Sequence, residues 1–338
     1  MDVHSRVRAL PRSGRRRRRE GLPCRPRLPR ERRRPGLGQA YPRHLHPRLK
    51  AETPSLGVVY DRNVKPAAIR AEPKPRKELG QHFLRDSGIL RDIAAAVRVP
   101  EEGFVLEIGA GTGELTAELL RQHGAVVAVE VEPRLVRYLR RRFAGQPQFR
   151  VIEADARTID LRGELGPGAR FAAVGNLPYY AANPIIRHLL ESSPQPTEIV
   201  AMLQREVAQE VAAKAGKRSL LTVAVEVYAE AEYLFSVPPE AFDPPPKVWS
   251  AVVRLRLRRE PLVPAERRKA FFELVSRTFR NPRKQIHNAL AQGVWLPKGG
   301  AHEALAAAGI DPMRRPETLS PGEWLALLDA VEAVRADA

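Results

Sequence analysis

The chain has 338 residues, of which 43% are hydrophobic, so it is long enough for one large packed domain and a smaller one. Its apolar runs are far shorter than the roughly 20 residues of a membrane span, and Cys24 is the only cysteine. The composition therefore argues against a membrane helix, a disulfide framework and a cysteine-based metal cluster. We expect an intracellular protein with no membrane association and no metal.

The formal net charge of +18 is concentrated near the N-terminus. Residues 1–70 contain 20 Lys and Arg against 5 Asp and Glu, a net charge of +15, whereas residues 71–338 carry only +3. If the body of the protein binds nucleic acid, it must therefore use a local basic patch rather than a positive surface overall.

Residues 1–70 combine an arginine run with frequent Pro and Gly and no apolar periodicity, which predicts a disordered basic extension. Three interpretations are open: an arm that binds RNA backbone, a mitochondrial transit peptide, and nonfunctional sequence upstream of the true start. Few serines and many prolines argue against the transit peptide. We favour the third interpretation, with a non-Met start at Val58, Val59 or Val64, because the next methionine is Met202.

Residues 71–260 alternate between short apolar strands and helices. A helix is predicted over residues 86–97, and Pro133 is suited to open another because proline favours the first helical position. Apolar strands separated by helices predict a parallel α/β sheet that is covered on both faces. The predicted strands are residues 104–108, 125–129, 149–152, 171–174 and 199–203.

The rest of the chain predicts a hairpin followed by a helical domain. After a helix over residues 206–214, two strand-like runs at 221–227 and 248–257 are joined by a proline-rich loop. Such a pair suits an antiparallel hairpin that closes the edge of the sheet. Residues 261–338 are predicted as a small all-helical domain, because the helical pattern runs from Ala265 with breaks at Asn281-Pro282, Pro297–Gly300 and Asp311-Pro312.

A glycine-rich turn follows the first of these strands and reads Glu107-Ile-Gly109-Ala-Gly111-Thr-Gly113. Glycines let the backbone turn tightly and approach a ligand that a Cβ would exclude. A dinucleotide-binding turn would have Gly or Ala where this chain has Glu114, and it would present a helix N-terminus to a pyrophosphate. The spacing instead matches the turn of S-adenosylmethionine-dependent enzymes, whose cofactor has no phosphate. A tight turn without a ligand is the alternative.

Two acidic residues follow later strands. Glu130 lies 17 residues after Gly113, at the end of the second strand, where an acid can accept hydrogen bonds from both hydroxyls of a ribose. Asp155 follows the third strand and is placed to accept a hydrogen bond from the adenine amine of the cofactor. The alternatives are a solvated loop acid at Glu130 and a helix N-cap at Asp155, before Arg157.

The most informative segment is Asn176-Leu177-Pro178-Tyr179, directly after the fourth strand. The exocyclic amine of adenine is a poor nucleophile because its lone pair is delocalised into the ring. The side-chain oxygen of Asn176 and the backbone carbonyl of Leu177 would localise that lone pair and hold it in line with a methyl sulfonium. Pro178 fixes the turn, and Tyr179 offers a ring face to a base that has left its own stack.

With the preceding motifs, this tetrad resembles the ribosomal RNA adenine N6-dimethyltransferases, most closely the housekeeping small-subunit enzymes. The resemblance implies a Rossmann-like class I S-adenosylmethionine-dependent methyltransferase sheet with a small all-helical C-terminal domain. Family members often continue with Asn-Ile-Ser, whereas this chain has Tyr180-Ala-Ala-Asn183, which leaves the packing of the following helix open. The similarity also covers residues 79–84, 202–207, 241–250, 279–286, 309–312 and 316–320.

The resemblance also implies roles for particular residues. S-adenosylmethionine would be contacted by residues from the glycine turn and the strand ends: His82, Leu84, Gly109, Gly111, Gly113, Glu130, Asp155 and Asn176. The target base would lie against Asn176, Leu177, Pro178, Tyr179 and Phe242, although a core phenylalanine is the alternative for Phe242. A basic cluster in the helical domain is expected to face RNA, with a solvated helix face as the alternative: Arg277, Arg280, Arg283 and Lys284.

The implied reaction transfers methyl groups from S-adenosylmethionine to the N6 amines of two adjacent adenosines in a hairpin near the 3′ end of small-subunit (16S) ribosomal RNA. The expected partner is the immature small ribosomal subunit, and the protein is expected to be a cytoplasmic monomer. Three alternatives are a large-subunit RNA adenine dimethyltransferase, a non-catalytic RNA-binding or transcription factor on the same fold and, more distantly, a DNA adenine methyltransferase.

Overall fold

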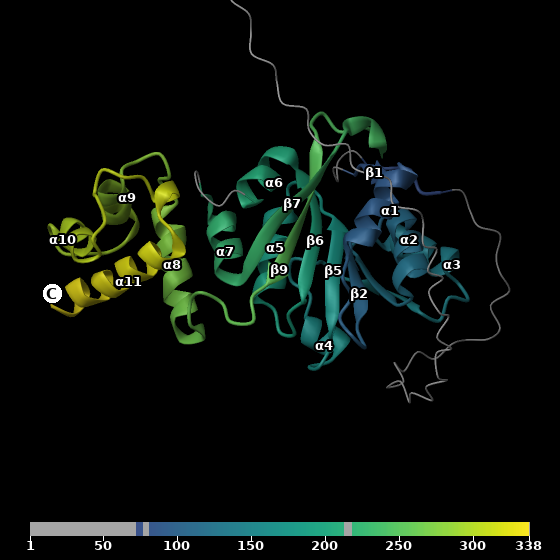
Figure 1. Ribbon diagram of the computed structural model, residues 1–338, viewed down its shortest axis with the longest axis horizontal. Helices are drawn as coiled ribbons and strands as arrows, with labels where there is room; N and C mark the ends of the chain where they lie inside the picture. Colours follow the sequence, from purple (N-terminus) through teal and green to yellow (C-terminus); the bar gives the residue numbers. More distant parts are fainter. Residues whose placement is uncertain (1–71, 77–80, 213–217, 338) are drawn as a thin grey trace, which may run out of the picture. The chain divides into compact units, whose positions relative to one another are not determined.

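The computed structural model describes residues 72–76, 81–212 and 218–337 (Figure 1). The predicted disordered extension, residues 1–70, lies outside this range, as do the end of the predicted helix over 206–214 and the first residues of the 79–84 motif. Within the described parts of the chain, no helix has the length and apolar character needed to cross a bilayer.

A seven-stranded sheet with the order β4-β3-β2-β5-β6-β9-β7 forms the centre of the fold. The first five strands in this order, β4, β3, β2, β5 and β6, pair in parallel, whereas β9 is antiparallel to both of its neighbours. The predicted parallel sheet is therefore confirmed, with boundaries that are the predicted ones for β2 and differ by at most two residues for the other parallel strands. The strands are β2 (Phe104–Ile108), β3 (Val126–Glu130), β4 (Phe149–Glu153), β5 (Phe171–Asn176), β6 (Glu198–Gln204), β7 (Ala229–Val237) and β9 (Ser250–Leu257).

Both faces of the sheet are buried, as the continuous apolar strands predict. In β5, Phe171 and Ala173 belong to one hydrophobic core, while Ala172 and Val174 belong to the core on the opposite face. Helices α1 and α2 cover the second of these faces, and α5 and α7 cover the first. The helices are α1 (Ser87–Ala96), α2 (Glu114–His123), α3 (Pro133–Arg142), α4 (Leu161–Leu165), α5 (Ala182–Glu191), α6 (Arg205–Ala212) and α7 (Leu220–Tyr228).

The predicted strand over residues 221–227 is wrong, because this segment forms helix α7. Seven of its nine residues are buried, so its apolar run has no periodicity that would distinguish a buried helix from a buried strand. Ser219 begins the helix, since its Oγ accepts a hydrogen bond from the N–H of Thr222 at 3.3 Å. The hairpin partner of β9 is instead the next segment along the chain, β7.

A two-stranded sheet joins distant parts of the sequence next to the carboxyl ends of the parallel strands. In it, β1 (Phe83–Leu84) pairs antiparallel with β8 (Phe242–Asp243), so that Leu84 lies opposite Phe242. A short 3-10 helix, η2 (Pro239–Ala241), leads into β8, and the carbonyl of Ala241 accepts the N–H of Arg85 at 2.8 Å.

Helices α8 to α11 gather beside α7 (Figure 1). Their buried side chains, including Phe271 and Trp324, continue the same hydrophobic core as α5 and α7, and the ring of Phe272 stacks on Tyr228 at 5.9 Å. The helical pattern and its breaks are as predicted, while the domain boundary at residue 260 stays a prediction. The elements are η3 (Ala265–Arg267), α8 (Arg268–Thr278), α9 (Ile286–Gly293), α10 (Gly300–Ala307), η4 (Pro316–Thr318) and α11 (Pro321–Ala336).

Candidate active site

A cavity of about 330 Å³ opens at the carboxyl edge of the parallel strands, where ligands bind in open α/β sheets. It is bounded by the ends of β2, β3 and β5, by the segment before β1, and by β8. Most of the residues that the sequence predicts for the site contribute to its lining. The lining includes Gln81, His82, Phe83, Gly109, Gly111, Glu130, Asp155, Arg157, Asn176, Leu177, Pro178, Tyr179, Tyr180 and Phe242.

The glycine-rich turn has a backbone conformation that glycine adopts most readily. Gly109, Gly111 and Gly113 have φ angles of 71°, 58° and 84°, in the left-handed region. A Cβ on Gly111 would lie 3.2 Å from the ring of Phe83, and one on Gly113 would lie 2.7 Å from the ring of Phe143. The turn therefore requires these glycines for its conformation and its packing, and Gly109 and Gly111 leave bare backbone at the cavity wall.

Glu130 is 5% exposed, and the turn holds its carboxylate in place. One carboxylate oxygen accepts the N–H of Gly111 at 3.0 Å, and the other accepts the N–H of Glu132 at 3.0 Å. Burial raises the pKa of Glu130, while these backbone N–H groups oppose the rise. Each oxygen has a second lone pair, so the group can still accept hydrogen bonds from a ligand in the cavity.

Glu107 is a second buried carboxyl group, on the face of β2 that is covered by α2. The hydroxyl of Thr116 in α2 donates to it at 2.6 Å, and both side chains are almost completely buried. Burial raises the pKa of Glu107 to about 8, and the negative charge of Glu130 adds to the rise. This hydrogen bond ties the strand before the glycine turn to the helix after it.

The start of α2 carries a negative side chain. Glu114 pairs with Arg142 at 2.6 Å and with Arg85 at 3.4 Å, and the hydrogen bond from Arg142 lowers its pKa. A carboxylate at this helix N-terminus occupies the position where a dinucleotide pyrophosphate would bind. The turn, the bare backbone and Glu130 together fit a nucleoside cofactor without phosphates, and S-adenosylmethionine has this chemistry.

Asp155 lies at the rim of the cavity and pairs with Arg157 at 2.6 Å, which lowers the pKa of Asp155. The N–H of Arg157 also donates to Asp155 at 2.9 Å. The residues after Asp155 form a turn rather than a helix, so the predicted alternative of a helix N-cap does not describe this position. Its carboxylate borders the cavity, and its role toward the cofactor remains a prediction.

The amide of Asn176 has a defined orientation. Its Nδ2 donates to the backbone carbonyl of His82 at 3.1 Å, and among the hydrogen bonds of the described residues none uses its Oδ1. The next residue, Leu177, is buried, and its N–H donates to the carbonyl of Met202 at 3.4 Å. Asn176 therefore presents a free acceptor oxygen in a turn that is anchored on both sides.

Aromatic side chains form the rest of the wall. The hydroxyl of Tyr179 lies 2.8 Å from Oγ of Ser250 in β9, and burial raises the pKa of Tyr179. The rings of Tyr179 and His82 stack with 6.5 Å between their centroids. Phe242 is only 5% exposed and lines the cavity. Nδ1 of His82 donates to the carbonyl of Pro244 at 2.7 Å, so the segment before β1 and the segment after β8 are joined here.

Two residues in the predicted cofactor set do not line the cavity. Leu84 is 6% exposed and packs in the core beside Phe242, and Gly113 is enclosed by the side chains of Leu139 in α3 and Phe143 just after it. Other lining residues were not predicted from the sequence, among them Gln81, Phe83 and Tyr180. Each of these is adjacent to a residue that was predicted, so extending the motifs by one position would have included them.

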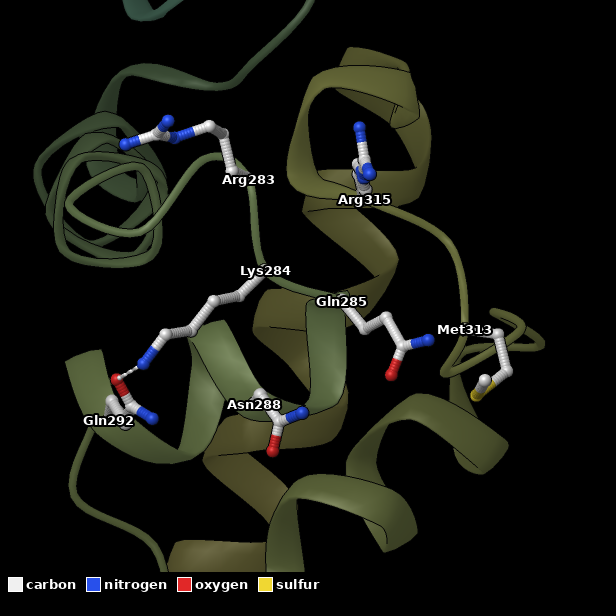
Figure 2. Close-up of a pocket in the computed structure, with 7 residues that line it drawn as sticks. All are labelled: Arg283, Lys284, Gln285, Asn288, Gln292, Met313 and Arg315. Atoms are coloured by element: carbon white, nitrogen blue, oxygen red, sulfur yellow. Dashed lines mark hydrogen bonds between the residues drawn. The ribbon is translucent and has the colours of Figure 1, made fainter.

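A second concavity, of about 630 Å³, lies in the helical region (Figure 2). Of the predicted RNA-facing residues, it brings together Arg283 and Lys284, whose Nζ donates to Gln292 at 2.6 Å. Arg280 is exposed but does not line it, and Arg277 pairs with Glu273 at 2.6 Å. Arg315 also lines this concavity but was not predicted, because it is distant in sequence from the others. The lining residues are Arg283, Lys284, Gln285, Asn288, Gln292, Met313 and Arg315.

The sheet, the glycine turn and the cavity define the class of protein: a class I S-adenosylmethionine-dependent methyltransferase. Sequence comparison defines the family more narrowly. Residues 73–332 match the family "Ribosomal RNA adenine dimethylase", and the chain belongs to it. This confirms the resemblance that the sequence motifs carry, including enzymatic activity and S-adenosylmethionine as methyl donor.

Close relatives share most of their length with this chain. A "Ribosomal RNA small subunit methyltransferase A" from Dehalococcoides mccartyi is 39% identical over 278 residues, which are 82% of this chain and 94% of the relative. The protein of the same name from Desulfitobacterium hafniense is 42% identical over 265 residues, covering 78% of this chain and 94% of the relative.

Solved structures agree with this assignment. A dimethyladenosine transferase from Plasmodium falciparum has a TM-score of 0.61 and 25% identity, covering 75% of this chain and 98% of that structure. The 23S rRNA methyltransferase ErmE has a TM-score of 0.57 and 31% identity, covering 74% of this chain and 99% of that structure. The predicted Rossmann-like methyltransferase fold is therefore confirmed.

Proposed function

We propose that this enzyme converts two adjacent adenosines, in a hairpin near the 3′ end of small-subunit ribosomal RNA, to N6,N6-dimethyladenosine. The observation that carries the proposal is the amide of Asn176, which offers a free Oδ1 in a cavity bounded by the glycine turn on one side and by aromatic rings on the other. The small-subunit relatives, at about 40% identity, support this choice of RNA.

In the proposed site, the glycine turn and Glu130 hold S-adenosylmethionine, with contributions from His82 and Asp155. When bound, this cofactor supplies an electrophilic methyl group. Oδ1 of Asn176 and the carbonyl of Leu177 accept hydrogen bonds from the adenine amine, which raises the electron density on its nitrogen and fixes its direction. The hydrogen bond between Nδ2 and His82 keeps Oδ1 in the accepting orientation.

The target base must leave its stack to enter the site, and flipping it out costs a few kcal/mol. The rings of Tyr179 and Phe242 replace the lost stacking on either face of the adenine in our proposal. The bond from Tyr179 to Ser250 fixes the plane of one ring, and the β1–β8 pairing fixes the position of the other. Pro178 holds the intervening turn.

RNA binding is assigned to residues 261–338, with Arg280, Arg283 and Lys284 as the main contacts and Arg277 as a weaker one, because Arg277 already pairs with Glu273. Arg315 joins this set, since it shares a concavity with Arg283 and Lys284 (Figure 2). Such contacts bind phosphates, while the site selects the base. We propose that the protein acts as a monomer on immature small subunits in the cytoplasm.

The test is methylation of immature small subunits and of large-subunit RNA with S-adenosylmethionine labelled in its methyl group, followed by nuclease digestion and nucleoside analysis. We expect labelled N6,N6-dimethyladenosine from the small subunit alone, mapped to two adjacent positions near the 3′ end. Label in the large-subunit RNA would favour the second candidate, to which the 31% identity with ErmE points. Cofactor binding without any transfer would favour the non-catalytic RNA-binding factor.

A further inference from the structure

An exposed tryptophan stands beside the active site and belongs to neither hydrophobic core. Trp249 precedes β9 and is 43% exposed. The guanidinium of Arg205 lies over its ring at 5.3 Å from the centroid, and the N–H of Arg205 donates to the carbonyl of Trp249 at 3.0 Å. Arg205 therefore contacts both the backbone and the ring of Trp249. These contacts hold the indole in place although it is not packed in a hydrophobic core.

The position of this pair relative to the site follows from the sheet. Because β9 is antiparallel to β6, its first residues lie at the edge where β6 ends, and Ser250 pairs there with Gln204. Ser250 is the residue that contacts the hydroxyl of Tyr179 at 2.8 Å. Trp249 thus lies one residue from a direct contact of the proposed base-binding tyrosine.

The surroundings of the indole are positively charged and apolar. Arg205 and Lys247 are exposed, and neither takes part in an ion pair among the described residues, although the exposed Glu206 follows Arg205 directly. Val248, between Lys247 and Trp249, is also 43% exposed. An exposed aromatic ring that is backed by a guanidinium and flanked by unpaired cations is the combination that binds single-stranded nucleic acid, with a base on the ring and phosphate near the cations.

We propose that Trp249 and Arg205 form a stacking site for the nucleotide next to the target adenosine. Extruding the target adenosine breaks its stacking with the neighbouring bases, so an adjacent base loses a stacking partner. The exposed face of the indole supplies a new one beside the catalytic tetrad. Arg205 holds the ring in place before RNA binds, and its charge attracts the adjacent phosphate. This inference rests on the proposed function, since it requires RNA as the substrate.

The first test measures steady-state methylation of immature small subunits by Trp249→Ala, Trp249→Phe and Arg205→Gln. We expect Trp249→Ala to raise KM for RNA about tenfold, the effect of losing one stacked base, with little change in kcat. Trp249→Phe should recover most of the loss because it retains an aromatic face. Arg205→Gln should weaken RNA binding and reduce its salt dependence. Cofactor affinity should stay unchanged in all three variants, which also reports on their folding.

Arg162→Gln is the matched control for Arg205→Gln, since Arg162 is an exposed arginine in α4, in the segment that leads to the amino end of β5. Its KM should equal that of the wild type. If Trp249→Ala also leaves KM unchanged, the stacking site is overturned, while methylation by the wild type would still support the proposed function. No methylation by the wild type would instead overturn the proposed function itself.

A second measurement identifies the stacked nucleotide. Hairpin RNAs with an abasic position on either side of the target adenosines should bind the wild type more weakly on one side only. Trp249→Ala should bind this abasic RNA as tightly as it binds intact RNA, because the variant already lacks the stacking interaction between the indole and the base. Equal losses in wild type and variant would contradict the proposal. Quenching of Trp249 fluorescence in a Trp295→Phe background gives an independent readout, since Trp324 is completely buried.

Discussion

Nδ2 of Asn176 donates to the carbonyl of His82, which leaves Oδ1 free to accept, so replacing Asn176 by Ala removes this acceptor. We expect Asn176→Ala to retain most of its affinity for S-adenosylmethionine and to lower kcat by about 10²-fold or more, the scale for losing one positioned polar group at a transition state. Single-turnover methylation is the measurement. Asn183→Ala, at an exposed position in α5, is the control and should keep full activity. Normal turnover by Asn176→Ala would remove this residue from the mechanism.

Glu130 links the glycine turn to the proposed ribose position. Glu130→Ala removes a charged acceptor, and the affinity for S-adenosylmethionine should fall by roughly 1–3 kcal/mol, as measured by calorimetry. Glu153→Gln is a matched control, because Glu153 is the exposed acid that pairs with Glu130 in register on the neighbouring strand. If the Glu130 variant and the wild type bind S-adenosylmethionine with equal affinity, Glu130 has only a structural role.

The buried carboxyl of Glu107 makes stability depend on pH. Its pKa is raised from 4.5 to about 8 in the folded protein, so the folded state retains a proton that the unfolded state releases. Stability should fall as the pH rises from 4.5 to about 8, by up to about 1.4 kcal/mol per pH unit from this group. Glu107→Gln keeps an acceptor for Thr116 but cannot ionise. Denaturant unfolding at several pH values should show a shallower fall in the variant, and parallel curves would contradict this account.

At the scale of elements, α7 is a helix although its β-branched residues favour a strand, because tertiary burial and the Ser219 cap stabilise the helix. Its Ser219 cap predicts a measurable contribution: Ser219→Ala should lower the free energy of unfolding by about 1 kcal/mol, because the N–H of Thr222 loses its acceptor. Ser219→Asp retains an acceptor and should remain close to the wild type. Chemical denaturation compares the three proteins, and equal loss in both variants would mean that the cap bond is not responsible.

At the scale of the whole molecule, most of the net positive charge lies in residues 1–70, where no site has been assigned. Deleting residues 1–70 removes a net charge of +15, and simple electrostatics predicts that RNA binding would collapse. We expect the truncated protein to retain most of its methylation of immature small subunits, because a basic arm contributes mainly nonspecific attraction. Its binding to random RNA should depend less steeply on salt. Methylation rates and salt titrations measure both effects.

The complementary change reverses charge in the helical domain while keeping the extension. Arg280, Arg283 and Lys284 replaced together by Glu should cripple binding of the small subunit. The matched control reverses Arg137, Arg140 and Arg141, three exposed residues in α3, and changes the net charge by the same amount. Loss of activity on truncation, combined with normal activity of the Arg280, Arg283 and Lys284 variant, would make the N-terminal extension the RNA-binding element.

The sequence by itself determined the features that depend on contiguous residues. The strand, the glycine turn and the helix around Gly111 follow from local sterics, since positive φ and close packing require glycine at fixed spacing. The tetrad that begins at Asn176 and the acid at Glu130 follow strand ends, and carboxyl ends of parallel strands meet at one edge. The family and the fold class could therefore be predicted without coordinates.

Only the tertiary structure decided which distant segments meet and which apolar run forms a strand. The pairing of Leu84 with Phe242, the position of Arg315 beside Arg283, and the contact of Ser250 with Tyr179 join residues that are far apart in the chain. No local pattern encodes such contacts, because they depend on how complete elements pack. The same reason explains the misassigned α7: a run buried on every side has no periodicity, so its conformation is set by the neighbours that bury it.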